Sequence, residues 1–292
     1  MKIAYLVLCH KNPNQIERLI KQLSSDNVDF YLHIDKKVSD IKLKPKDNVY
    51  YVDEKDRVDV QWASISMVYA TMALIKKALC SNIKYDYYFL ISGQDFPIKS
   101  NTFIESFLKD NKGYNFIQIL SHSDPMYKRY SKRNALYYPN WMFSQKILVK
   151  ILRKIYIYIS GGYGFTFKLF MRKQKNNIIF EYGSQWWGLE RKCLIWIYNF
   201  LRKNNNLERI FNNSLTPDEC VFQTAYMMSP YSNMHKDKVV FLEWSSNMNN
   251  PKILTMLDKR VLLADKVNLF ARKFDENQDS QIIDCIEKNI SS

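Results

Sequence analysis

Residues Ile91 to Ser100 read Ile-Ser-Gly-Gln-Asp-Phe-Pro-Ile-Lys-Ser, and an apolar run from Tyr87 to Ile91 leads into them. The run is rich in aromatic and β-branched residues and has the length of a buried strand. A Ser-Gly pair ends it, and Pro97 turns the chain away because proline has no N–H for a central strand. Asp95 follows the strand end, where open α/β sheets bind ligands. The alternative is an Asx-type turn, in which Asp95 bonds its own backbone.

The amino-terminal region predicts a strand, loop, helix and strand in that order. The continuous apolar run Ile3 to Leu8 is typical of a parallel strand covered on both faces, and a helix is expected from Asn14. Phe30 to Ile34 predicts a second strand, which completes a βαβ unit of the kind found in nucleotide-binding sheets. Asp35 directly follows it, in the position of a ribose or base contact, or else as a solvated turn residue.

Composition bounds the class of protein. The chain has 292 residues, of which 47% are hydrophobic and 15% aromatic, and only 7 are Gly and 8 Pro. These values predict one compact α/β domain over residues 1–292 without a low-complexity linker. The net charge of +14 indicates an anionic partner: a nucleotide sugar, a nucleic acid or a phospholipid surface. Lysines beside asparagines in several surface-like runs suggest a general compositional bias as the alternative.

The five cysteines are widely spaced and form no CxxC pair, which argues against a zinc site and a disulfide framework. The sequence lacks a signal peptide and an apolar span of 18 residues. We therefore expect a cytoplasmic protein with reduced thiols.

Residues 141–171 alternate apolar groups with Lys and Arg at helical spacing. Such a helix could lie in a membrane interface, against anionic headgroups on the inner face of the cytoplasmic membrane. A helix that faces the core and has a solvated basic side is the favoured interpretation. The polar, basic and aromatic stretch from Ser121 to Pro139 is expected to be a substrate-side loop.

Three later motifs carry candidate chemistry. Gly183 to Trp187 contains two adjacent tryptophans, which suit a sugar platform, although one of them should face the core because neighbouring strand residues point opposite ways. Thr216-Pro-Asp-Glu219 predicts a helix start with Glu219 as the capping-box acid. Leu269 to Asp275 places two cations between apolar anchors, as pyrophosphate binding requires; a surface salt-bridging pair is the alternative.

Together these stretches resemble the core-2/I-branching glycosyltransferases, the group that includes branching β-1,6-N-acetylglucosaminyltransferases and peptide O-xylosyltransferases. The resemblance rests on Ile3 to His10 with Tyr31 to Lys37, Val60 to Val68, Ile91 to Ser100, Gly183 to Leu189, Thr216 to Thr224, Phe241 to Ser245 and Leu269 to Asp275. The motifs follow the family's order over nearly the whole chain. The membrane anchor and cysteine-rich stem of animal Golgi members are absent from this sequence, so it looks like a bacterial cytosolic relative.

The resemblance implies a GT-A-type fold, which is a mixed, mostly parallel sheet flanked by helices. Residues 1–120 would form the nucleotide-binding half, and residues 121–292 the acceptor-binding and catalytic half. The implied reaction is inverting transfer of a sugar, foremost N-acetylglucosamine, from a UDP-sugar to a hydroxyl of a glycan, glycolipid or peptide, in bacterial surface polysaccharide synthesis. The family's general base aligns with Glu219.

The leaving diphosphate needs positive charge. Many GT-A enzymes supply a metal ion through an Asp-x-Asp motif, but Asp53, Asp56 and Asp59 have the wrong spacing. The resemblance implies that Lys252 and Lys273 take this role, with no metal cofactor. The open alternative is a metal-dependent transferase that uses Asp95.

The resemblance also implies two sets of contacts. The donor residues would be Leu8, Cys9, His10, Asp35, Lys36, Lys37, Trp62, Asp95, Lys252 and Lys273. The acceptor residues would be Gln185, Trp186, Trp187, Glu243, Trp244 and Arg129. A basic nucleic-acid-binding protein is a reading from a different class, but the cations are not gathered on one helix and no such motif is present, so we expect no nucleic-acid partner.

Overall fold

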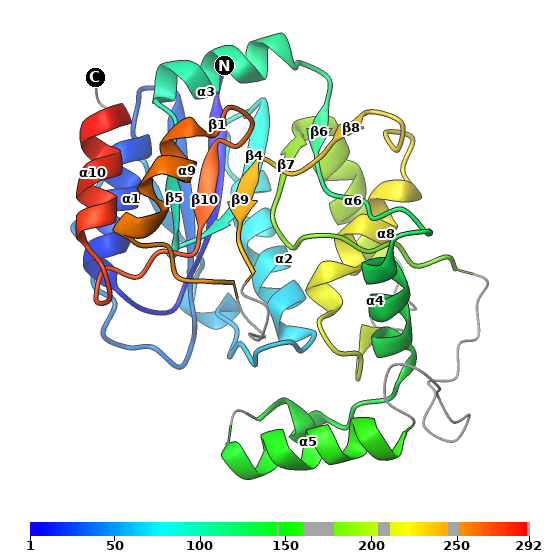
Figure 1. Cartoon of the computed structure of the whole chain (residues 1–292). Helices are drawn as coiled ribbons and strands as arrows, with labels where there is room; N and C mark the ends of the chain where they lie inside the picture. Colours follow the sequence, from blue (N-terminus) through cyan, green and yellow to red (C-terminus); the bar gives the residue numbers. More distant parts are fainter. Residues whose placement is uncertain (145, 161–177, 204–210, 245–250, 291–292) are drawn as a thin grey trace.

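The computed structural model describes residues 1–144, 146–160, 178–203, 211–244 and 251–290. Within these ranges, seven strands form one sheet in the order β3-β2-β1-β4-β7-β6-β8 (Figure 1). The strands are β1 (Ile3–Cys9), β2 (Val28–Ile34), β3 (Val49–Tyr51), β4 (Tyr87–Ser92), β6 (Asn115–Phe116), β7 (Trp187–Glu190) and β8 (His235–Lys236). Among these described strands, only β7 runs antiparallel to its neighbours, β4 and β6. The predicted fold class, a mixed and mostly parallel sheet, is confirmed.

The register of the central strands places their carboxyl ends side by side. In β1, Cys9 lies opposite Ile34 of β2, and Leu8 lies opposite Ser92 of β4. Nearly every residue of these strands is buried, which explains their continuous apolar sequences. The segments that follow the three strands therefore meet at one edge of the sheet, where a ligand site is expected.

A second sheet and the helices cover this layer. The small sheet has the order β5-β10-β9, with β5 (Asp95–Pro97), β9 (Val240–Leu242) and β10 (Phe270–Arg272). Phe270 packs on Tyr5 and Phe89 of the large sheet, with ring centroids 5.8 and 5.7 Å apart. The α-helices are α1 (Pro13–Leu23), α2 (Ser66–Leu79), α3 (Asn101–Asp110), α4 (Pro125–Ala135), α5 (Ile147–Ile159), α6 (Arg191–Lys203), α8 (Val221–Met227), α9 (Lys259–Ala264) and α10 (Gln281–Ile290). Helix α2 packs on β1 and β2 (Figure 1).

The predicted strands over Ile3 to Leu8, Phe30 to Ile34 and Tyr87 to Ile91 are confirmed. Two local predictions are wrong. The turn that contains Pro97 is a short strand, β5, which proline tolerates because β5 is at the edge of its sheet. The stretch from Ser121 to Pro139 is not a loop throughout, since it holds α4. Asp124 caps that helix by accepting a hydrogen bond from the Met126 N–H at 2.7 Å.

The amphipathic stretch 141–171 is described in part. Trp141 to Phe143 belong to a 3₁₀ turn, η2 (Asn140–Phe143), and Ile147 to Ile159 form α5. Residues 145 and 161–171 lie outside the described ranges. No residue of α5 is buried, so the expectation of a core-facing helix is wrong for this part of the stretch.

Candidate functional site

A cavity of about 570 Å³ lies where β1, β2 and β4 end. Its walls come from these strand ends, the start of α2, helix α4, the segment before β7 and the end of β10. It contains the predicted base, Glu219, and nine of the predicted donor and acceptor residues: Leu8, Cys9, His10, Asp35, Trp62, Gln185, Trp186, Trp244 and Lys273. Residues from nearly the whole length of the chain, from Leu8 to Lys273, therefore line one cavity.

The floor of the cavity is organised around Arg272, which the sequence analysis did not single out. Its Nη1 donates to Oδ1 of Asp95 at 2.8 Å and also to the hydroxyl of Ser92. Its guanidinium carbon lies 4.3 Å from the ring centroid of Trp186, in a cation–π contact. Arg272 adjoins Lys273 in the Leu269 to Asp275 motif, and the paired cations there were the signal that could have identified it.

Asp95 holds Arg272 at this position by accepting its hydrogen bond. Its side chain is fully buried, and its second oxygen accepts a hydrogen bond from the Ser92 N–H at 2.6 Å. Burial raises the pKa of Asp95, while Arg272 and the Ser92 N–H oppose the rise. Asp95 does not line the cavity. Its side chain bonds the backbone three residues before it, not two residues after it, so the Asx-type turn expected as the alternative does not form. Asp95 instead holds Arg272 in place.

Lys273 follows Arg272 in the chain and also lines the cavity. Within the described ranges it forms no ion pair with a carboxylate. Burial, followed by the positive charges of Arg272 and Lys11, lowers its pKa. Partial burial, Lys11, Lys273 and Arg272 likewise lower the pKa of His10 to about 4. This end of the cavity has an excess of positive charge that a bound anion would neutralise.

The structure does not bring Lys252 to this place. Its Nζ lies 2.6 Å from Oδ1 of Asp258 and 3.4 Å from Oε2 of Glu243, and none of the three residues lines the cavity. Arg272, not Lys252, is the residue that accompanies Lys273.

Glu219 lies in η4 (Pro217–Glu219), far from Arg272 and Lys273 in the sequence, and lines the same cavity. Its Oε2 accepts a hydrogen bond from Nη2 of Arg133, in α4, at 2.6 Å. The predicted capping box is absent. Thr216 has φ 51° and its hydroxyl donates to the Leu215 carbonyl, so no side chain caps this turn. The Glu219 side chain is consequently not folded back on its own backbone.

Asp218 lies beside Glu219 and also lines the cavity, although only 6% of its surface is exposed. Burial and the neighbouring Glu219 raise its pKa. In the part of the chain that the structure describes, its Oδ1 has no hydrogen-bond partner. In the sequence, Asp218 was expected only to belong to the helix-start motif.

Asp35 lies at the end of β2. Its Oδ1 accepts hydrogen bonds from the backbone N–H groups of Lys37 and Val60, at 3.1 and 3.3 Å. Lys37 bonds to Asp59 at 2.9 Å, and neither Lys36 nor Lys37 lines the cavity.

The two tryptophans separate as expected. Trp187 is buried against Phe222, with ring centroids 5.6 Å apart, whereas Trp186 lines the cavity. Gln185 lines it too, and its buried Nε2 has no hydrogen-bond partner among the described residues. Arg129 is exposed on α4 and lies outside the lining.

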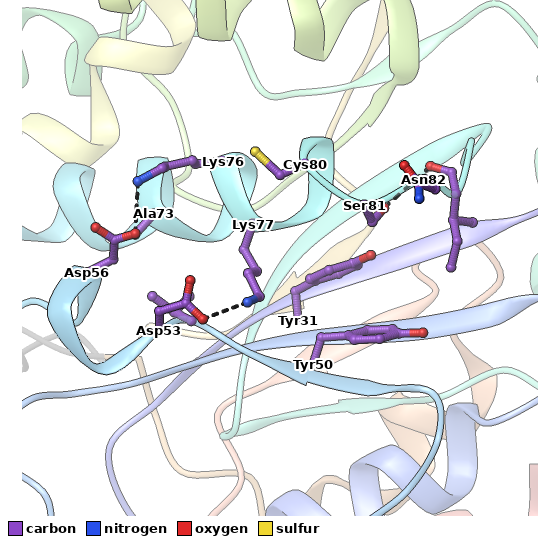
Figure 2. Close-up of a pocket in the computed structure, with 12 residues that line it drawn as sticks. Tyr31, Tyr50, Asp53, Asp56, Ala73, Lys76, Lys77, Cys80, Ser81 and Asn82 are labelled. Carbon is purple, nitrogen blue, oxygen red and sulfur yellow. Dashed lines mark hydrogen bonds and ion pairs between the residues drawn. The ribbon is translucent and has the colours of Figure 1, made fainter.

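A second cavity of about 490 Å³ lies between α2 and the strands β2 and β3 (Figure 2). Tyr31 and Tyr50 stack along it, with ring centroids 5.2 Å apart. Its lysines are neutralised by the ion pairs drawn in Figure 2. Lys77 lies 2.7 Å from Asp53, and Lys76 lies 2.8 Å from Asp56. This cavity therefore lacks the excess charge found beside Lys273.

Asp53, Asp56 and Asp59 thus each pair with a lysine. Among the described residues, no group of three or more His, Cys, Asp or Glu side chains is arranged to hold a metal ion.

Comparisons with known proteins identify a family and several similar proteins. A model of the Core-2/I-Branching enzyme family matches residues 3–261. The β-1,3-galactosyl-O-glycosyl-glycoprotein β-1,6-N-acetylglucosaminyltransferase 4 of Danio rerio is 23% identical, over 99% of this chain and 69% of that protein. Xylosyltransferase 2 of Rattus norvegicus is 20% identical over 98% of this chain, which spans 33% of that protein's length. The apo structure of mouse xyloside xylosyltransferase 1 superposes with a TM-score of 0.39 and 9% identity, covering 93% of this chain and 97% of that one.

Proposed function

Because the chain belongs to the Core-2/I-Branching enzyme family, and is therefore a glycosyltransferase, we propose that it transfers N-acetylglucosamine from UDP to a hydroxyl of a glycan or glycolipid, with inversion. The observation that carries this proposal is the shared cavity. It holds a carboxylate, Glu219, together with two cations, Lys273 and Arg272. Those are the charges that an acceptor hydroxyl and a leaving diphosphate need.

In the proposed reaction, Glu219 accepts the proton of the acceptor hydroxyl. The hydroxyl oxygen forms a bond to the anomeric carbon as the bond from that carbon to the diphosphate breaks on the opposite face. Lys273 and Arg272 stabilise the negative charge that develops on the diphosphate. Arg133 holds the Glu219 carboxylate in place through the 2.6 Å contact. Asp35 and Trp62 are proposed to contact the nucleoside, and Trp186, Gln185 and Trp244 the sugars.

We propose that the reaction needs no divalent metal. Both oxygens of Asp95 are engaged, one by Arg272 and the other by the Ser92 N–H. A metal ion bound there would have to displace Arg272 from a fully buried carboxylate, at considerable cost. The cations already present can neutralise the leaving group.

The test is binding and turnover with a panel of UDP-sugars (N-acetylglucosamine, xylose, glucose and galactose), with and without EDTA. Glu219→Gln should bind the donor as the wild type does, but turnover should fall by about 10²- to 10⁴-fold because the general base is lost. Glu54→Gln is the matched control, since Glu54 also accepts from an arginine, Arg57, at 2.6 Å but lies on the surface.

Turnover of UDP-xylose alone would replace the proposed donor while leaving the mechanism intact. A strict requirement for Mn²⁺ would overturn the metal-independent part. Wild-type turnover by Glu219→Gln would remove Glu219 as the base.

A further inference from the structure

Helix α5 presents an apolar face to solvent. Seven of its 13 residues are large, apolar and exposed, with exposed fractions from 41% for Leu152 to 84% for Tyr158. The seven are Ile147, Leu148, Ile151, Leu152, Ile155, Tyr158 and Ile159. At 3.6 residues per turn they occupy one continuous arc of about 140°. A continuous apolar surface of this kind usually marks an interaction site.

The helix is attached to the fold by its other side. Nη1 of Arg153 donates to the Met142 carbonyl at 3.0 Å, and the rings of Tyr156 and Tyr138 meet at 6.0 Å. Figure 1 shows α5 outside the layers formed by the sheets and the other helices. Arg153 also lies 5.8 Å from the ring centroid of Trp62, which lines the active-site cavity. The exposed face is therefore turned away from the protein by contacts that hold the helix beside the cavity.

Positive charge is concentrated in the part of the sequence that contains α5. Between Asp124 and Glu181 the sequence contains twelve Lys and Arg residues and no Asp or Glu, so this segment accounts for twelve of the fourteen net charges of the chain. On α5 itself, Lys150 and Lys154 border the apolar arc, and within the described ranges neither forms an ion pair. General compositional bias does not explain a charge that is confined to one fifth of the sequence.

We propose that α5 docks this protein on an anionic membrane surface, lying in the interface with its apolar face among the acyl chains and its lysines at the headgroups. An apolar arc bordered by basic residues, on a helix without acids, is the arrangement of an interfacial helix. In the described part of the chain, no helix is long and apolar enough to cross a membrane. Each lysine near an anionic surface strengthens binding by roughly fivefold. This membrane-docking proposal does not depend on which sugar the protein transfers.

The test is cosedimentation of the full chain with vesicles of phosphatidylcholine alone or with 30 mol% phosphatidylglycerol. The wild type should bind the anionic vesicles, and high salt should weaken the binding. Lys150→Gln/Lys154→Gln should lower the partition coefficient by about 30-fold. Ile151→Ser/Ile155→Ser should lower it by about tenfold or more on either composition.

Matched controls lie elsewhere on the surface. Lys259→Gln/Lys266→Gln removes two exposed lysines, and Leu257→Ser/Val267→Ser removes two apolar side chains that are 91% and 69% exposed. Both controls should bind as the wild type does. Because every substituted side chain is exposed, all variants should unfold at the wild-type temperature.

Absence of binding to anionic vesicles, or equal binding by the α5 variants and their controls, would overturn the proposal. So would self-association of the wild type, measured by sedimentation velocity, that is lost in Ile151→Ser/Ile155→Ser without any vesicle binding. That result would make the apolar face an interface between copies of this chain.

Discussion

Nη2 of Arg133 donates a hydrogen bond to Oε2 of Glu219 at 2.6 Å, across 86 positions of sequence. The arginine comes from α4, within a stretch expected to be a loop, and the glutamate from a turn expected to cap itself. Because α4 forms and the capping box does not, the carboxylate is oriented by a residue from another part of the fold.

We expect Arg133→Met to lower kcat by about 10²-fold with little change in donor affinity, because a small displacement of the base from the acceptor hydroxyl has an effect of that size. Arg133→Lys should restore part of the rate through its charge. Steady-state kinetics with the preferred donor would measure both. An unchanged kcat in Arg133→Met would show that the contact does not position the base.

Asp95→Asn is expected to reduce stability by about 3 kcal/mol, because it leaves the Arg272 charge without its buried partner. Donor affinity should also fall, since Arg272 would no longer be held at the cavity. The measurement is urea unfolding followed by donor titration. Asp53→Asn is the control: Asp53 pairs with Lys77 at 2.7 Å on the surface, and its loss should cause no measurable change. Equal stability of the two variants would contradict the role given to Asp95.

Donor binding should weaken at a lower pH than it would if Lys273 had the pKa of an ordinary lysine. If the charged form of Lys273 binds the diphosphate as proposed, affinity is full below its pKa and is lost as the pH rises through that value. Burial, Arg272 and Lys11 lower this pKa from the usual value of about 10.4, which moves the loss to lower pH. Lys273→Arg should move it upward, because guanidinium stays protonated. Isothermal titration from pH 7 to 10 would measure this, with Lys77→Arg as the control. An alkaline limb at the same pH in both variants would exclude Lys273 as its source.

Gly183→Ala should destabilise the protein by about 3 kcal/mol and reduce turnover. A Cβ at Gly183 would lie 1.9 Å from the backbone oxygen of Gln118, which cannot move aside readily. The Gly183 N–H also donates to the Glu219 carbonyl at 3.0 Å, so the clash would displace the turn that carries the base. Gly93→Ala is the comparison, because its Cβ would meet side-chain atoms only, with Cγ1 of Ile16 nearest at 2.8 Å, and no backbone atom. Denaturant midpoints of the two variants, together with kcat, would check this. The explanation fails if Gly93→Ala is the more damaging change.

The sequence alone was sufficient for the order of the central elements. The apolar runs that precede Cys9, Asp35 and Ser92 have the length and composition of buried parallel strands, and the carboxyl ends of such strands share one edge of a sheet. Asp35 directly follows one of these ends, and the family resemblance added His10 and Lys273 to the expected donor contacts. The structure brings these three residues into one cavity.

What only the tertiary structure decided are the partners of the charged side chains and the face that each helix buries. Arg272 bonds to Asp95 across 177 positions of sequence, whereas Lys252 pairs with Asp258. Nothing in the neighbouring sequence of either cation specifies its partner. The amphipathic pattern of α5 is the same whether its apolar face meets a core or solvent. Local patterns specify helices and strands because they depend on near neighbours, whereas these pairings depend on how distant segments pack.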